Sequence, residues 1–108
     1  APTDNTIAAG MTTVAMVANE NGLPTICGEV GMVENGGLAS VSINYEELGY
    51  RAGEMAVQIL TEGADPAEMP IETMSADECD LVYNQQTADS LGVDVSALAD
   101  EGGQDVSA

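Results

Sequence analysis

Stretches with helical periodicity alternate along this chain with short runs of strand-forming residues, and this alternation limits the possible folds most strongly. A helix is predicted after Asn44, a preferred N-cap residue, because apolar side chains recur at helical spacing until Gly63. Further helices are predicted over residues 6–21 and 85–92. Candidate strands cover residues 23–27, 38–43, 70–74 and 80–84. This order is typical of an α/β fold, and we expect three layers around a mostly parallel sheet.

The predicted sheet is incomplete at its start. The opening segment APTDN (residues 1–5) has the composition of a joint between a strand and a helix, but no strand precedes it. We therefore expect residues 1–92 to form one incomplete lobe. Residues 93–108 are acidic and rich in Gly, Ser and Ala, without a regular apolar period, and this composition predicts a flexible tail.

The charge of the chain disfavours two classes of partner. Arg51 is the only basic side chain among 19 acidic ones, and the net charge is −18. A surface of this kind repels the phosphates of nucleic acids and the head groups of anionic lipids. We therefore expect no nucleic-acid partner and no binding to an anionic membrane surface, and we interpret the acidic surface as one that favours solubility.

Three polar loops are predicted at the carboxyl ends of the strands, where α/β sheets bind ligands. Their candidate binding residues are Thr3, Asp4, Asn5, Glu29, Asn44 and Tyr45. The carboxylates of Asp4 and Glu29 could hold an ammonium group. The side chains of Asn5 and Asn44, with free N–H groups at the helix starts, could bind a carboxylate. An amino acid carries both groups, but Asp4, Asn5 and Asn44 are also common capping residues, and Glu29 could simply be solvated.

A catalytic role is not predicted for this chain. It has no His or Lys, no serine in a nucleophile motif and no phosphate-binding loop. The absence of His also argues against a metal site, and no cofactor is expected. The enzymatic alternative is a small Mg²⁺-dependent enzyme that uses Asp4 and Glu29. Cys27 and Cys79 could form a disulfide or remain reduced.

Several segments together resemble the substrate-binding proteins of ABC transporters. They are PTDNT, GEVGMVENGGLASVSINYEELG, PAEMPIE and LVYNQQTADSLG. The resemblance is to the C-terminal half of type I periplasmic binding proteins, in the branch implicated in uptake of tryptophan and other aromatic amino acids. It covers nearly all of residues 1–92 and implies a flavodoxin-like or Rossmann-like lobe, without its N-terminal partner lobe.

This resemblance implies a binding protein rather than an enzyme. The loop around Asp4, the position of Glu29 and the position of Asn44 would then contact a solute held between two lobes. It further implies an extracytoplasmic protein, periplasmic or lipid-anchored, that delivers an amino acid to an ABC permease. The helix after Asn44 would belong with the missing lobe, so the isolated chain could form a homodimer or exchange strands. The alternative within this fold is the ligand-sensing domain of a regulator or receptor.

Overall fold

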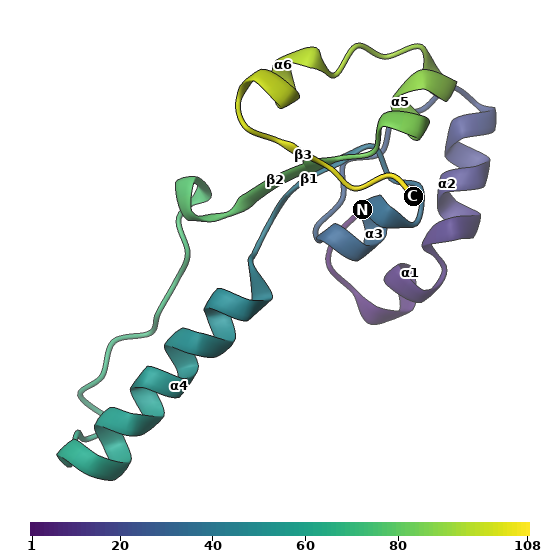
Figure 1. Cartoon of the computed structure of the whole chain (residues 1–108). Coiled ribbons are helices and arrows are strands. Elements are labelled where there is room, and N and C mark those ends of the chain that lie inside the picture. The colour runs from purple at the N-terminus through teal and green to yellow at the C-terminus, as the bar shows by residue number, and fades with distance from the viewer.

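The computed structural model describes residues 1–108 and consists of a packed body with a projecting arm (Figure 1). The body comprises residues 1–44 and 80–108. The arm, residues 45–79, consists of helix α4 (Tyr45–Glu62), the returning chain and the 3₁₀ helix η1 (Ala76–Glu78). The molecule measures 55 × 32 × 21 Å, and its radius of gyration is 17.3 Å. A compact chain of this length would have a radius near 13 Å, and the projecting arm accounts for the difference.

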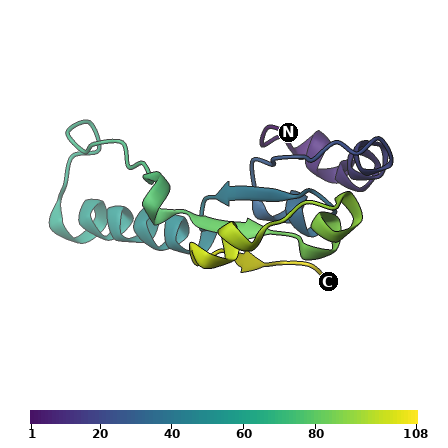
Figure 2. The same cartoon turned by 90° about the horizontal axis from the view of Figure 1, so that it is seen from above.

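The body is built around a small sheet of three strands. Its elements are α1 (Asn5–Ala9), α2 (Met11–Glu20), α3 (Val30–Glu34), β1 (Ala39–Ser42), β2 (Asp80–Tyr83), α5 (Gln85–Leu91), α6 (Ser96–Asp100) and β3 (Gln104–Asp105). The strand order is β1-β2-β3, with β1 antiparallel to β2 and β2 parallel to β3. Figure 2 shows the arm leaving one end of this sheet, with α1 and α2 towards the other end.

The structure confirms that helices and strands are mixed around a small sheet, as predicted for an α/β fold. The pairing of its strands differs from the mostly parallel sheet that we predicted. After β1 the chain runs out along the arm and comes back to the same end of the sheet, so that Ser42, the last residue of β1, lies opposite Asp80, the first residue of β2. Because β2 starts where β1 ends, the two strands are antiparallel. The parallel pairings are β2 with β3 and a single bridge between Ile26 and Ala39.

Three other predicted elements also differ. Residues 23–27 make only the Ile26 bridge, and residues 70–74 form no strand because they lie in the arm, away from the sheet. The helix predicted over 6–21 is divided into α1 and α2, which meet at Gly10. The helix predicted after Asn44 is confirmed, since α4 starts at Tyr45 and ends before Gly63.

Residues 93–108, for which we predicted a flexible tail, include the helix α6 and the strand β3. Val95 is buried in a cluster with Leu38 and Tyr83, and α6 follows it. The N–H of Val106 donates to the carbonyl of Tyr83 at 2.8 Å, next to the β2–β3 pairing. Each short element contributes only one or two inward apolar residues, so the sequence shows no period.

The core consists of two small clusters. One contains Met11, Ala15, Cys27, Met32, Val33 and Val82, and the other contains Leu38, Ala39, Tyr83, Ala88 and Val95. Only 16 of the 108 residues are buried, so each core contact carries a large share of the stability. Asn84 connects α3 with the start of α5: its side chain donates to the carbonyl of Val33 at 2.9 Å and accepts the N–H of Thr87 at 3.0 Å.

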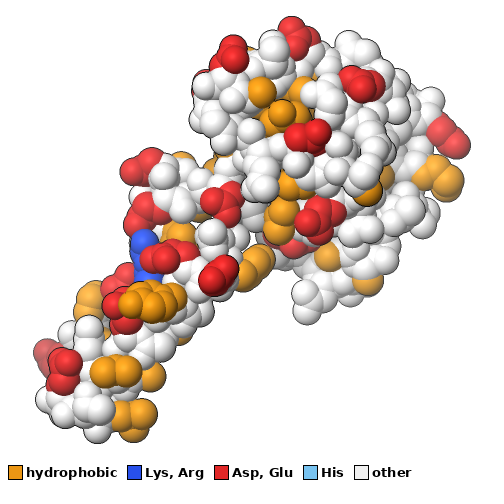
Figure 3. All heavy atoms as spheres, viewed as in Figure 1, with side chains coloured by type: hydrophobic (Ala, Val, Ile, Leu, Met, Phe, Trp, Pro, Cys, Tyr) orange, Lys and Arg blue, Asp and Glu red, His pale blue; other side chains and the backbone are white.

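The arm contributes no residue to these clusters. No residue of α4 is buried, and large apolar side chains such as Tyr50, Val57 and Leu60 are exposed. Arg51 connects α4 to the foot of the arm, because its Nε lies 2.9 Å from Glu47 Oε1 and its Nη2 lies 2.8 Å from Glu78 Oε1. Figure 3 shows this basic group among acidic side chains on the arm. The cysteines are not bonded to each other.

Substitution of Gly37 by alanine should destabilise the body. A Cβ atom at Gly37 would collide with Cys27 Sγ and lie 3.0 Å from the Met32 carbonyl oxygen. Overpacking of this kind costs about 1–3 kcal/mol. Chemical denaturation should show this loss for Gly37→Ala, whereas Gly49→Ala in the exposed α4 should be neutral or stabilising by up to about 1 kcal/mol. Equal stability of the two variants would contradict the packing seen around Gly37.

The carboxyl group of Glu78, in η1 where the arm rejoins the body, should titrate at unusually low pH. The N–H of Ser75, the Arg51 guanidinium and the Ser75 hydroxyl lower the pKa of Glu78 to about 2, from an ordinary value of 4.5. The carboxylate therefore favours the folded arm above pH 4.5, and this contribution is lost as the pH falls from 4.5 towards 2. NMR titration of Glu78 should give the low midpoint in the wild type and a higher midpoint in Arg51→Gln. Identical midpoints would contradict the ion pair.

Candidate functional site

The first two predicted loops are in direct contact. The hydroxyl of Thr3 donates to the carbonyl of Gly28 at 3.0 Å, and the amino group of Ala1 donates to the carbonyl of Ile26 at 2.8 Å. A Cβ atom at position 28 would collide with Thr3 Oγ1 and lie 2.6 Å from the Thr3 nitrogen. Glycine at this position therefore allows the loop that carries Asp4 to lie against the loop that carries Glu29.

The second loop is in turn joined to the end of β1. The N–H of Val30, the residue after Glu29, donates to Ser42 Oγ at 3.1 Å. The Ser42 hydroxyl lies 3.4 Å from the carbonyl oxygen of Ile43, which immediately precedes Asn44. The structure thus places all three predicted loops side by side at one edge of the body. This edge, defined by residues 3–5, 28–29 and 44–45, is called the polar edge below.

The predicted side chains on the polar edge also cap helices. Asp4 Oδ1 accepts the N–H groups of Thr6 and Ile7 at 2.8 and 3.0 Å at the start of α1. Asn44 Oδ1 accepts the N–H of Glu47 at 3.0 Å at the start of α4. These bonds confirm the capping alternative for Asp4 and Asn44.

Glu29 is a cap as well, rather than a purely solvated side chain. Its Oε2 accepts the N–H of Gly31 at 3.0 Å at the start of α3. Asn5 is the first residue of α1 and is exposed. The second oxygens, Asp4 Oδ2 and Glu29 Oε1, accept no hydrogen bond from the chain, so capping orients the two carboxylates without occupying them fully.

The polar edge is open to solvent and carries no cationic side chain. Asp4 and Glu29 line no cavity, while Asn44 borders a shallow hollow of about 210 Å³ with Glu46, Glu47 and Tyr50. The single guanidinium of the chain, Arg51, already pairs with two glutamates. The edge can therefore attract a positively charged group with its carboxylates, and a ligand carboxylate would depend on N–H donors.

Tyr45 is the aromatic residue of the polar edge, and Ser42 is buried beside it at the end of β1. Tyr45 is 53% exposed directly after Asn44, so its ring is accessible to a planar ligand group. Ser42 is the residue that sequence reasoning missed. Its only signal was one of two hydroxyls on a short predicted strand, and this signal does not reveal the N–H that it meets twelve residues earlier in the chain.

The structure supplies no grouping typical of a metal centre. No three His, Cys, Asp or Glu side chains gather closely enough to hold an ion. Asp4 and Glu29, which the magnesium alternative would use, cap different helices. None of the helices combines the length and the apolarity that a bilayer span requires.

Comparison with known proteins gives consistent relatives. The family model of ABC transporter substrate binding proteins matches residues 1–101. A tyrosine-binding protein from Clostridioides difficile (strain R20291) is 44% identical over 90 residues, which are 83% of this chain and 25% of that protein.

Solved structures agree with this match. The ligand-free, open structure of a substrate binding protein with adhesive properties from Clostridium difficile has 45% identity and a TM-score of 0.67, over 86% of this chain and 30% of the other. The ABC domain in complex with L-Trp from Streptococcus pneumonia has 38% identity and a TM-score of 0.75, over 91% of this chain and 33% of the other.

A third structure, of a conserved domain protein from Vibrio cholerae, has 27% identity and a TM-score of 0.76, over 96% of this chain and 33% of that one. The chain therefore spans about a quarter to a third of the length of the proteins that it matches. Since the family model covers nearly the whole chain, the chain belongs to the ABC transporter substrate-binding protein family.

Proposed function

We propose that the polar edge forms one wall of a binding site for an amino acid, with an aromatic amino acid as the first candidate. The observation that carries this proposal is the pair of hydrogen bonds, Thr3 to Gly28 and Val30 to Ser42, that hold the three loops side by side. The relatives support the choice of ligand, because one is named a tyrosine-binding protein and another was solved in complex with L-Trp.

The chemistry of the edge suits the charged groups of an amino acid. The free oxygens of Asp4 and Glu29 accept hydrogen bonds from the ligand ammonium. The amide of Asn44 donates to the ligand carboxylate, and the Asn5 side chain offers a second donor. Tyr45 provides a ring against which an aromatic side chain stacks. In this proposal the chain binds and releases its ligand unchanged and is not an enzyme.

The other wall of the site comes from the part of the protein that this chain does not span. A good small-molecule site buries 70–90% of its ligand, and one open edge cannot do so. The exposed apolar face of α4, with Tyr50, Val57 and Leu60, packs against that other lobe in this proposal. Closure of the two lobes around the ligand then shifts the population from open to closed. The isolated chain would instead cover this face by forming a dimer.

The biological role that we propose is solute capture for an ABC importer. The protein would act outside the cytoplasm, free in the periplasm or held by a lipid anchor, and would deliver its ligand to the permease. The family assignment supports this role.

Calorimetric titration of the full-length protein that contains this chain should detect saturable binding of L-tyrosine or L-tryptophan. L-alanine should bind more weakly, because it offers the same charged groups without a ring. The complete set of twenty amino acids should be tested under the same conditions. Failure of all twenty to bind would contradict the proposal, and preference for a non-aromatic amino acid would contradict the role of Tyr45.

Removal of the charge of Asp4 should weaken ligand binding. Asparagine is as good a cap as aspartate, so Asp4→Asn keeps α1 intact and removes the partner of the ligand ammonium. Loss of a charged hydrogen bond costs about 1.5–3 kcal/mol, or roughly tenfold or more in Kd.

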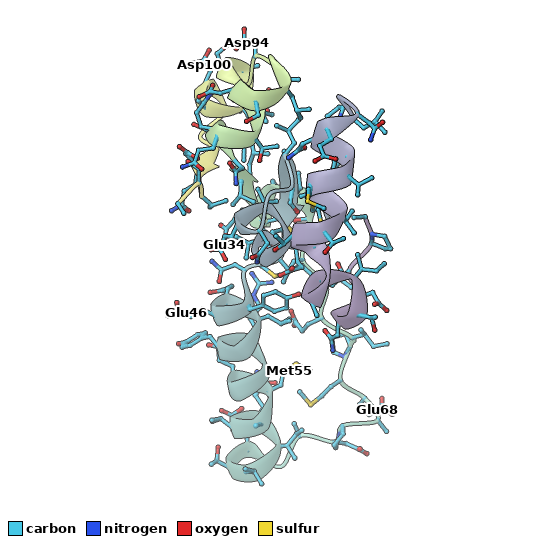
Figure 4. The ribbon with its side chains drawn as sticks, turned by 90° about the vertical axis from the view of Figure 1, so that its right-hand side faces the viewer. Glu34, Glu46, Met55, Glu68, Asp94 and Asp100 are labelled. Atoms are coloured by element: carbon cyan, nitrogen blue, oxygen red, sulfur yellow. The ribbon has the colours of Figure 1, made fainter.

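Asp94→Asn is a matched control, because Asp94 Oδ1 similarly accepts the N–H of Ser96 at 2.9 Å. Figure 4 shows Asp94 well away from Glu46, which marks the start of α4. Titration of both variants with the same amino acid should give weaker binding only for Asp4→Asn. Equal affinities would show that Asp4 is a cap and nothing more.

A further inference from the structure

Two buried serines on β1 differ in the use of their hydroxyl groups. Ser40 and Ser42 are 2% and 1% exposed and stand two residues apart, on the same side of the strand. Ser40 Oγ has no hydrogen-bond partner. Ser42 Oγ accepts the N–H of Val30 at 3.1 Å and is close to the carbonyl of Ile43. The strand thus contains one serine that connects two loops and one that connects nothing.

We propose that Ser42 is a positioning residue for ligand binding, which acts through Glu29 and Asn44 without touching the ligand. This inference rests on the proposed function of the polar edge. In this role, Ser42 sets the distance between the loop that carries Glu29 and the loop that carries Asn44, and their relative orientation.

The start of α3 explains why an external acceptor matters there. The first N–H groups of a helix have no partner within the helix. In α3 the Glu29 side chain accepts the N–H of Gly31, and Ser42 accepts the N–H of Val30. The bond from Gly31 fixes the carboxylate of Glu29, and the bond from Val30 to Ser42 fixes the backbone directly after Glu29. Only one of these bonds, the one to Ser42, is anchored in the sheet.

The same hydroxyl reaches towards the third loop. Its distance of 3.4 Å to the carbonyl oxygen of Ile43 places it beside the residue that precedes Asn44. Removal of the Ser42 hydroxyl would leave the partly buried N–H of Val30 without an acceptor. The chain around Glu29 would then move until water reaches this N–H, and the distance between Glu29 and Asn44 would change with it.

The test compares Ser42→Ala with Ser40→Ala in the full-length protein. Both variants remove one buried hydroxyl from the same face of the same strand. Ser42→Ala should weaken binding of L-tyrosine or L-tryptophan by about three- to tenfold, as expected for loss of one hydrogen bond. Ser40→Ala should leave the Kd unchanged. Amide hydrogen exchange at Val30 should accelerate only in Ser42→Ala, which shows that the loop and not the whole fold has loosened.

A double-mutant cycle with Glu29→Gln separates positioning from a general loss of structure. If Ser42 acts through Glu29, the effect of Ser42→Ala on Kd should shrink in the Glu29→Gln background. Additive effects, or equal affinities of the Ser42→Ala and Ser40→Ala variants, would overturn the positioning role while wild-type binding continues to support the proposed function. Failure of the wild type to bind any amino acid would overturn both.

Discussion

The ladder between β1 and β2 is the constraint on which the rest of the molecule depends. Its register pairs Ala39 with Tyr83 and Ser42 with Asp80. Val82 enters one core cluster and Tyr83 enters the other, so a shift of one residue would exchange the two faces. The same ladder holds the two ends of the arm together, because it pairs Ser42 with Asp80, and it fixes the position of the end of β1 just before Asn44. Core, arm and polar edge are thus set by one short pairing of strands.

On the polar edge, side chains that we propose as ligand contacts also cap helices. Asp4, Glu29 and Asn44 each accept a backbone N–H at the start of a different helix. Because capping fixes the rotamer of a side chain, the free oxygen of Asp4 or Glu29 and the free NH₂ group of Asn44 are each held in one direction. Such preorganisation lowers the entropic cost of binding. A capping residue at the carboxyl end of a strand is therefore compatible with a binding role rather than an argument against one.

Local signals in the sequence predicted those elements whose causes are local. The helix after Asn44 was predicted correctly because its cap, its apolar spacing and its terminal glycine all lie within the helix and its ends. The antiparallel pairing of β1 was not predictable in this way, since it depends on the path of the returning arm. Residues 70–74 have the composition of a strand, but they have no neighbouring strand in this chain.

The polar edge shows the same limit. Its three loops were predicted from polar residues after the predicted strands, and hydrogen bonds join the first loop to the second and the second loop to the end of β1. The bond from Val30 to Ser42 joins residues twelve positions apart and could not be read from either segment alone. The structure of residues 93–108 depends on contacts of Val95 with Leu38 and Tyr83, which are likewise distant in sequence.

The position of Asn44 has a mechanical consequence. This residue belongs to the polar edge and also begins α4, whose 18 residues span about 27 Å at 1.5 Å per residue. A rotation of about 10° at the start of α4 would displace the far tip of the helix by about 5 Å. A small change in backbone direction beside the polar loops would therefore become a large displacement at the tip of the arm.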